Sequence, residues 1–231
     1  GPALLVALGL TALSVGAIVT NLRRPAGVTA AGRSPGPPPV VAPGRTLDMS
    51  ATLFRPGLLA ADPLSSGSAV HPGDALHLIV EAREPAHVYV LDEDEHGNAY
   101  LLFPVAGVDL RNPLPAGRHR LPGRRGGEDL DWQVTSSGGR ETIVILASRT
   151  PLASIEKRAG DLPQAEMSRP VTYAELNPED FRGIVGLMES PVLGPGTKAP
   201  RITEIARGLV DRDPGEGGLW VRLFELENPA P

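Results

Sequence analysis

The sequence predicts a mainly β protein, an antiparallel β-sandwich of the immunoglobulin-like or a related kind, with two or three short helices and one preceding transmembrane helix. Three observations predict this architecture. The 231 residues include 27 Gly and 25 Pro, a share typical of many turns and short strands. From Asp48 onward, short apolar runs alternate with turn-forming residues at intervals of about ten residues, as in a sandwich or barrel. Before them stands one long uncharged apolar run.

That apolar run covers residues 2–22, PALLVALGLTALSVGAIVTNL, and contains no charged side chain. At 1.5 Å per residue, a helix of this length spans roughly 30 Å, the thickness of the hydrocarbon core of a membrane. We therefore expect residues 2–22 to bind the membrane as a single transmembrane helix. A cleaved signal peptide is the alternative, because residues 14–17 are small, although no basic region precedes the run.

Residues 23–45 consist largely of Pro, Gly, Ala and Arg, a composition that cannot bury enough apolar area to fold, and we expect a disordered linker. Arg23 and Arg24 directly follow the apolar run, which alone would place the following domain in the cytoplasm. The rule compares both flanks, so this criterion leaves the orientation open. Our working expectation is a single-pass protein of the bacterial inner membrane whose C-terminal domain, residues 46–231, is extracytoplasmic (periplasmic).

Charge is unevenly distributed along the chain. Residues 1–45 carry four arginines and no acid, so residues 46–231 hold 18 basic and 27 acidic side chains, a net charge of −9. An acidic domain has no electrostatic footprint for a polyanion, and we expect no nucleic-acid partner. The chain has no cysteine, which excludes disulfides, thiolate metal sites and cysteine nucleophiles.

Strands are expected where apolar and polar residues alternate. In DALHLIVEA, for example, Leu76, Leu78 and Val80 share one face. The run ETIVILAS is almost entirely apolar, which suits a central strand. The expected strands cover residues 48–54, 74–82, 87–91, 99–103, 131–134, 141–148 and 219–227.

Helices are expected at residues 151–159, 177–188 and 202–209. The second has the clearest start signal, because Asn177 can cap it and Pro178 suits its first turn. Acidic residues follow, and they favour a helix N-terminus.

The densest polar stretch is LDEDEHGNAYLLFP, residues 91–104. The calcium-loop template D-x-[DN]-x-[DN]-G-x5-E can be laid on it from Asp92, but its fifth position is then His96 and its twelfth is Phe103. Neither residue is a ligand of the required kind, and both flanks have strand character. We therefore expect no metal site.

A β-hairpin explains the same stretch, because strands 87–91 and 99–103 flank a turn containing Gly97. We expect its acidic residues to lie at a solvated tip. Loops held by rigid strands often carry binding residues. The candidate ligand or partner contacts are Asp92, Asp94, Glu95, His96 and Asn98.

The sequence matches none of the catalytic motifs considered. The five histidines are scattered, and the chain lacks an H-E-x-x-H pair, a G-x-S-x-G elbow and a G-x-x-x-x-G-K-[ST] loop. We predict no catalytic residue and no cofactor. The enzyme alternative is a carboxylate-dependent hydrolase using Asp92 or Asp94 with His96, and two carboxylates converging in a concave pocket would favour it.

One ordered series of motifs spans about residues 48–152. It consists of Gly73-Asp74 before a strand, Val88-Tyr89-Val90, Leu102-Phe103-Pro104, Asn112-Pro113-Leu114, and Gly139 and Glu141 before IVILAS. This series resembles the bacterial domain-of-unknown-function family 4384 (DUF4384). The resemblance implies a compact β domain, often C-terminal to other modules in bacterial signalling or envelope proteins, including kinases and caspase-like proteins. It supplies no catalytic residues.

Together these features predict a membrane-anchored, non-catalytic β-sandwich module of a bacterial envelope or signalling protein, which binds an unidentified protein or small-ligand partner. The alternative is the C-terminal sensory domain of a kinase or anti-sigma factor whose cytoplasmic part would precede Gly1.

Overall fold

A computed structural model describes residues 47–57, 60–135, 138–161, 174–176, 201–210 and 218–229. The expected transmembrane helix at 2–22, the linker at 23–45 and the helix at 177–188 lie outside the described residues. Within these ranges, none of the helices combines the length and the apolar character that a membrane crossing requires.

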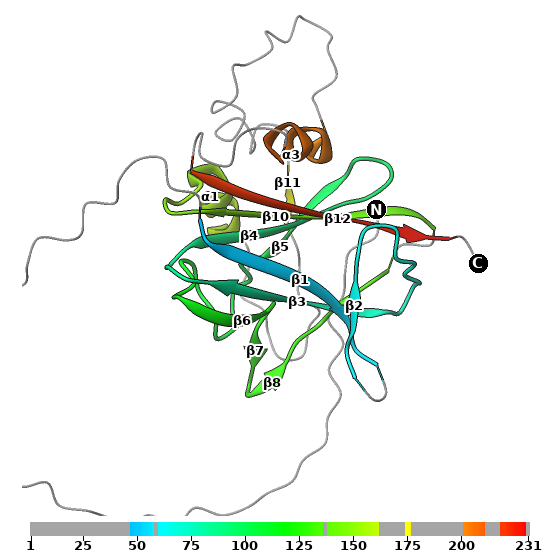
Figure 1. The fold of residues 1–231 in the computed structure, drawn as a ribbon, viewed down its shortest axis with the longest axis horizontal. Coiled ribbons are helices and arrows are strands. Elements are labelled where there is room, and N and C mark those ends of the chain that lie inside the picture. Colours follow the sequence, from blue (N-terminus) through cyan, green and yellow to red (C-terminus); the bar gives the residue numbers. More distant parts are fainter. Residues whose placement is uncertain are drawn as a thin grey trace, which may run out of the picture.

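The described strands form two larger antiparallel sheets and one small hairpin (Figure 1). The first sheet has the order β2 (Asp62–Leu64), β1 (Met49–Arg55), β3 (Ala75–Ala82) and β6 (Gly117–Leu121), with β9 (Trp132–Gln133) also paired to β3. The second has the order β11 (Ala174–Leu176), β5 (Ala99–Phe103), β4 (His87–Glu93), β10 (Gly139–Ser148) and β12 (Leu219–Asn228). The hairpin joins β7 (Arg124–Arg125) and β8 (Glu128–Asp129). The predicted mainly β, antiparallel fold is confirmed.

The predicted central strand is β10. It pairs antiparallel with β4 on one side and with β12 on the other, so its backbone is hydrogen-bonded along both edges. The last strand of the chain therefore completes the second sheet, as its alternating sequence predicts.

A hydrophobic core fills the space between the two sheets. The first sheet contributes the predicted face of Leu76, Leu78 and Val80, and each of these side chains is at least 98% buried. The second sheet contributes alternate residues such as Val90 and Ile145, because successive side chains of a strand point to opposite faces.

A second core lies on the outer face of the second sheet. Helices α1 (Ala153–Gly160) and α3 (Ile202–Val210), both predicted from sequence, cover this face (Figure 1). Ile155 of α1 and Ile205 of α3 pack in the same cluster as Tyr89 and Val144 of the sheet. Strand β4 is consequently buried on both faces, which explains why its segment from Val88 to Leu91 is continuously apolar rather than alternating.

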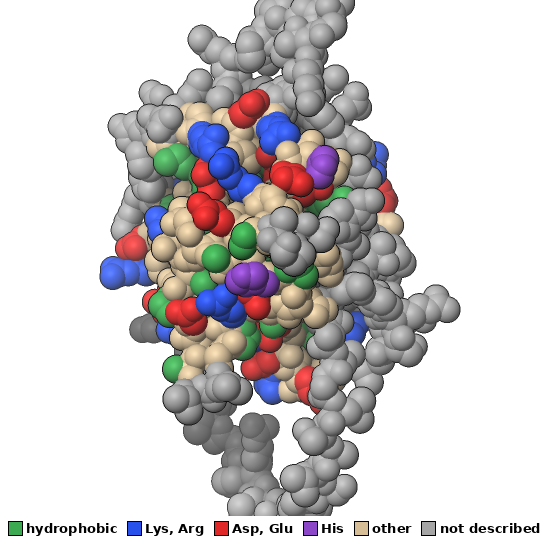
Figure 2. All heavy atoms as spheres, turned by 90° about the vertical axis from the view of Figure 1, so that its right-hand side faces the viewer, with side chains coloured by type: hydrophobic (Ala, Val, Ile, Leu, Met, Phe, Trp, Pro, Cys, Tyr) green, Lys and Arg blue, Asp and Glu red, His purple; other side chains and the backbone are tan. Residues whose placement is uncertain are grey.

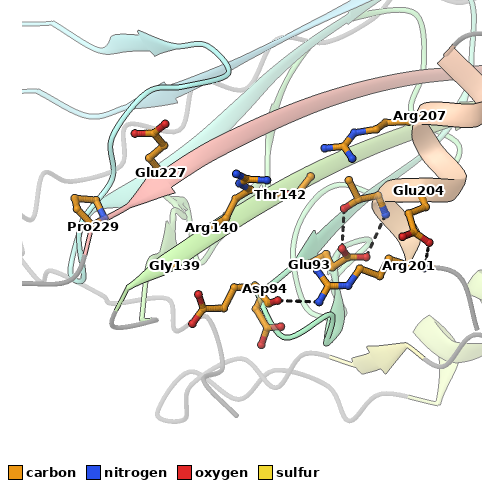
Figure 3. Close-up of a pocket in the computed structure, with 12 residues that line it drawn as sticks. Glu93, Asp94, Gly139, Arg140, Thr142, Arg201, Glu204, Arg207, Glu227 and Pro229 are labelled. Atoms are coloured by element: carbon orange, nitrogen blue, oxygen red, sulfur yellow. Dashed lines mark hydrogen bonds between the residues drawn. The ribbon is translucent and has the colours of Figure 1, made fainter. Parts of the chain in front are cut away.

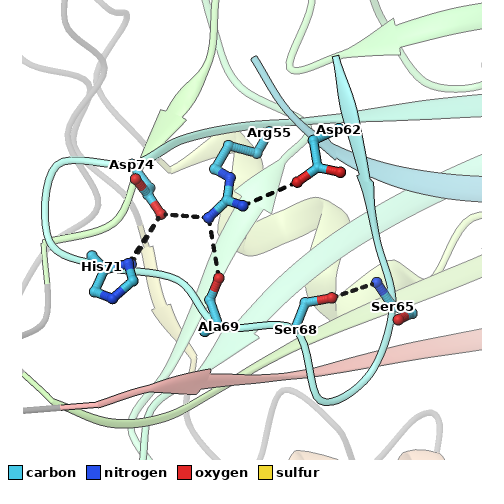
Figure 4. Close-up of polar contacts among 7 residues, drawn as sticks. All are labelled: Arg55, Asp62, Ser65, Ser68, Ala69, His71 and Asp74. Carbon is cyan, nitrogen blue, oxygen red and sulfur yellow. Dashed lines mark hydrogen bonds and ion pairs between the residues drawn. The ribbon is translucent and has the colours of Figure 1, made fainter. Parts of the chain in front are cut away.

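The Gly-Asp motif before β3 ties the start of that strand to β1 (Figure 4). The carboxylate of Asp74 accepts hydrogen bonds from the backbone N–H of His71, at 3.0 Å, and from the guanidinium of Arg55, at 3.2 Å. Arg55 also donates to Asp62 of β2, at 3.0 Å, and to the carbonyl oxygen of Ala69, at 3.2 Å. The motif therefore has a structural explanation.

The Asn-Pro-Leu motif likewise supports the sheet. The side-chain oxygen of Asn112 accepts a hydrogen bond from the backbone N–H of Val88, at 3.0 Å, and its nitrogen donates to the Val88 carbonyl oxygen, at 2.8 Å. Leu114 is fully buried and bridges to Ala86. A side-chain amide thus satisfies backbone groups at the start of β4.

Candidate functional site

The predicted hairpin is present, and β4 and β5 are its two strands. Asp94 organises its turn. One carboxylate oxygen accepts hydrogen bonds from the backbone N–H groups of His96 and Asn98, at 2.9 and 2.8 Å. The other accepts a hydrogen bond from the side-chain nitrogen of Asn98, at 2.7 Å. Gly97, with a φ of 85°, supplies the left-handed conformation that closes the turn.

The expectation that the acidic residues lie at a solvated tip is wrong for three of them. Asp92, Glu93 and Asp94 are only 6%, 3% and 6% exposed, whereas the side chains of Glu95 and His96 are 47% and 73% exposed. The physical reason is the two-sided burial of β4, which continues through Glu93. Strand alternation directs Asp92 into the interior between the sheets and Glu93 under α3.

Asp92 lies beside the carboxyl group of Glu141 on the neighbouring strand. Burial first, and then the negative charge of Glu141, raise the pKa of Asp92 well above its ordinary value. The adjacent interior cavity measures about 10 Å³, and apolar side chains such as Leu102 and Trp132 line it together with the two carboxyl groups. This space could hold at most about one water molecule and no substrate.

Glu93 holds the start of α3. Its carboxylate accepts hydrogen bonds from the backbone N–H of Thr203, at 3.1 Å, and from the Thr203 hydroxyl, at 2.8 Å. Arg201, just before the helix, donates to the carbonyl oxygen of Glu95 at 2.9 Å. A buried carboxylate can be accommodated there because helix N-termini leave N–H groups without intrahelical partners.

An open cleft of about 730 Å³ lies between this hairpin, the first residues of β10, the end of β12 and α3 (Figure 3). Most of its described lining is charged, and both signs are present. The lining includes the carboxylates Glu93, Asp94, Glu95, Glu204 and Glu227, the guanidinium groups of Arg140, Arg201 and Arg207, and the hydroxyls of Thr142 and Thr203.

The end of the molecule that faces the viewer in Figure 2 shows the same mixture. Acidic and basic side chains are interspersed over this face, with smaller hydrophobic areas between them. A surface of this kind favours polar partners over apolar ones, because each charge keeps a polar environment when a charged or hydrogen-bonding partner replaces water.

The structure brings only two of the five sequence-predicted contacts, Asp94 and Glu95, to this cleft. Asp92 lines the interior cavity, while His96 and Asn98 belong to the turn and are not among the described lining residues. Carboxylates including Asp94 do converge in this cleft, but His96 is not among its described lining residues and Asp92 lines the interior cavity, so neither carboxylate of the hydrolase alternative shares a described pocket with His96.

Sequence reasoning missed Arg140, Thr142 and Arg207. A signal existed for the first two, because they are alternate polar residues at the start of a strand whose following residues, Ile143 to Ala147, are all apolar. Arg207 offered none, since its place depends on how α3 packs against β10 and β12, far from it in sequence.

The turn itself can be tested by mutation. Asp94→Ala removes the acceptor of three hydrogen bonds and is expected to lower the free energy of unfolding by roughly 1 to 3 kcal/mol. The exposed neighbour Glu95→Gln is the matched control and should change it by about 0.5 kcal/mol or less. Urea unfolding followed by tryptophan fluorescence measures both. Equal effects would show that Asp94 does not organise the turn.

Comparison with known proteins bears on the central part of this fold. Residues 69–151 match the family model described as Domain of unknown function (DUF4384). No curated protein and no solved structure matches the chain. The matched range contains β3, the hairpin and β10, and therefore Arg140 and Thr142, whereas β1, α3 and β12 lie outside it. Residues 69–151 are thus similar to the DUF4384 family, as the order of the motifs indicates.

Proposed function

We propose that this protein is a non-catalytic binding module of a bacterial envelope or signalling protein, and that the cleft beside the hairpin receives its partner. The scaffold is a β-sandwich of the immunoglobulin-like or a related kind. Residues 2–22 anchor it in the inner membrane, and residues 23–45 display it on the periplasmic side. The observation that carries the proposal is the cleft of about 730 Å³, a volume within the usual range of ligand sites.

The composition of the cleft favours a polar protein segment over an apolar small molecule. Sites for drug-like ligands are lined predominantly by apolar and aromatic side chains, whereas the described lining of this cleft is mostly Asp, Glu, Arg and Thr. The net charge of −9 on residues 46–231 argues against a nucleic acid. Placement in an envelope or signalling protein rests on the family resemblance alone.

The arrangement of polar groups supports binding rather than catalysis. The Thr203 hydroxyl and the Glu93 carboxylate are within hydrogen-bond reach, but the same carboxylate also accepts the Thr203 backbone N–H, an arrangement that caps a helix. Among the described residues, no group of three or more His, Asp and Glu side chains is placed to hold a metal ion.

Site-specific crosslinking in the native bacterial host tests the proposal. A photoreactive phenylalanine analogue is placed at Glu227, an exposed cleft residue, or at Arg111, an exposed residue that is not among the lining residues. We expect a light-dependent adduct of defined mass from position 227 only, on a chain that stays in the membrane pellet after alkaline carbonate washing. Adducts of the same kind from both positions, or from neither, would overturn the assignment of the cleft.

The same fractions test the membrane anchor. A soluble product that begins after about Ala17 would show that residues 2–22 contain a cleaved signal peptide and not a transmembrane helix.

A further inference from the structure

Thr142 lies on the floor of the cleft and is 4% exposed. Its hydroxyl has no hydrogen-bond partner in the described part of the chain. A hydroxyl left available at the bottom of an open cleft is therefore suited to a polar atom of a ligand.

Two guanidinium groups lie on either side of Thr142 (Figure 3). Arg140 precedes Thr142 by two residues on β10, so both side chains project from the same face. Within the described residues Arg140 is exposed and makes no hydrogen bond or ion pair. Arg207 extends from α3, and Figure 3 shows the guanidinium groups of Arg140 and Arg207 directed toward one another, with Thr142 between them.

Arg207 is only partly engaged. Its Nε donates to Glu225 at 3.1 Å, and its Nη2 also contacts that carboxylate. A guanidinium has five N–H donors, so, as far as the described residues go, the Nη1 group stays available for another acceptor. Arg140, Arg207 and Thr142 can together present several donors to one anionic group, the arrangement that recognises carboxylates and phosphates.

Carboxylates stand on both sides of Arg140. Glu227 is its register partner on β12. The side chain of Glu95 crosses Gly139, where an added Cβ would lie only 2.1 Å from the Glu95 carboxylate. Gly139, with a φ of 100°, permits this close approach. Charges near Arg140 therefore alternate as negative, positive and negative.

We infer that Arg140, Thr142 and Arg207 form the subsite for a carboxylate of a peptide ligand, and that Glu95 and Glu227 receive basic side chains on either side of it. This inference rests on the proposed binding function of the cleft. A singly charged carboxylate fits better than a phosphate, because the neighbouring Glu residues repel a doubly charged group more strongly. An extended peptide with charged residues at alternate positions presents the complementary pattern on one face.

Nuclear magnetic resonance titration of the ¹⁵N-labelled 231-residue chain in detergent micelles tests this pattern. The probes are the blocked peptides Lys-Gly-Glu-Gly-Lys, Lys-Gly-Gln-Gly-Lys and Glu-Gly-Lys-Gly-Glu, and inorganic phosphate. We expect the first peptide to shift the side-chain Nε–H signals of Arg140 and Arg207 and the amide signal of Thr142. The other two peptides should bind about tenfold more weakly, since each lacks the central carboxylate.

Variants of the subsite complete the test. Arg140→Gln and Thr142→Val should each weaken binding of the first peptide about fivefold or more, because each removes donors to the carboxylate. Arg111→Gln, which changes an exposed arginine outside the described lining, should leave it unchanged. Arg140 is exposed, so its variant should fold even if Thr142→Val does not.

Three outcomes would overturn the inference. Tighter binding of phosphate than of the first peptide would show an anion site of another chemistry. If all three peptides bound equally, Arg140, Thr142 and Arg207 would not form a carboxylate subsite. The same conclusion would follow if no peptide shifted the signals of Arg140 and Arg207. A crosslink from position 227 would in that case still support the binding function of the cleft.

Discussion

Replacing Phe103 by alanine is expected to lower the free energy of unfolding by roughly 3 to 5 kcal/mol. Phe103 ends β5, pairs in register with Val90 of β4 and is fully buried in the core between the sheets. Truncation would remove the apolar ring and leave a cavity, which the surrounding strands cannot close because each is hydrogen-bonded to its neighbours.

Phe54→Ala is the matched control for this prediction. Phe54 is partly exposed and stacks on the imidazole of His77, with 5.5 Å between the ring centroids. Its loss removes that stacking, worth about 0.5 to 1.5 kcal/mol, and part of the apolar contact. Urea unfolding of the three proteins measures the difference. Equal losses for the two variants would contradict the placement of Phe103 in the closed core.

Replacing Asp92 by asparagine is expected to stabilise the protein at neutral pH. Burial and the nearby charge of Glu141 raise the pKa of Asp92 well above its ordinary value of 3.8, so the folded protein keeps a proton that the unfolded chain releases. Asparagine has nearly the same shape, does not titrate, and can donate a hydrogen bond to Glu141.

The pH dependence follows from linkage. The contribution of Asp92 is fully present below pH 3.8, where both states are protonated, and it is lost as the pH rises toward the folded-state pKa. The slope is at most about 1.4 kcal/mol per pH unit. Wild type and Asp92→Asn should therefore differ least below pH 3.8, and the advantage of the variant should grow as the pH rises above it.

Unfolding at a series of pH values measures this effect. Asp129→Asn is the control, because the Asp129 side chain is 56% exposed and its ion pair with Arg124 lies on the surface. Its stability should run parallel to that of the wild type across the series. If the Asp92 variant also ran parallel to the wild type, Asp92 would not be the buried titrating group.

Local sequence patterns were sufficient for β1, β3, β4, β5, β9, β10 and β12, for the hairpin and for two of the helices, whereas β2, β6, β7, β8 and β11 were not predicted. Alternation at a period of two identifies β3 and β12, and the apolar run before Ser148 identifies β10 as a central strand. Gly97 between two strand-like segments identifies the hairpin. These features depend on residues adjacent in the chain, so a single sequence contains the information that specifies them.

The burial of the acidic residues in the hairpin could be recognised only from the packed structure. Asp92 and Glu93 look like solvated charges in the sequence, yet the first faces Trp132 across the interior cavity and the second binds the N-terminus of α3. Burial of β4 on both faces depends on α3 and on the first sheet, which are distant in the chain. No local pattern around residue 92 reports those contacts.

The cleft has the same origin. Arg140 and Thr142 occupy one strand, Glu227 another and Arg207 a helix, and their side chains line one space only because β10 pairs with β12 while α3 packs across both. The sequence therefore identifies the strands that have a clear alternation or apolar run and the two described helices, since propensity and periodicity act over a few neighbouring residues. It does not reveal which charged side chains become buried or line the cleft. Those outcomes depend on packing between elements that are far apart in the sequence, and local patterns do not report such contacts.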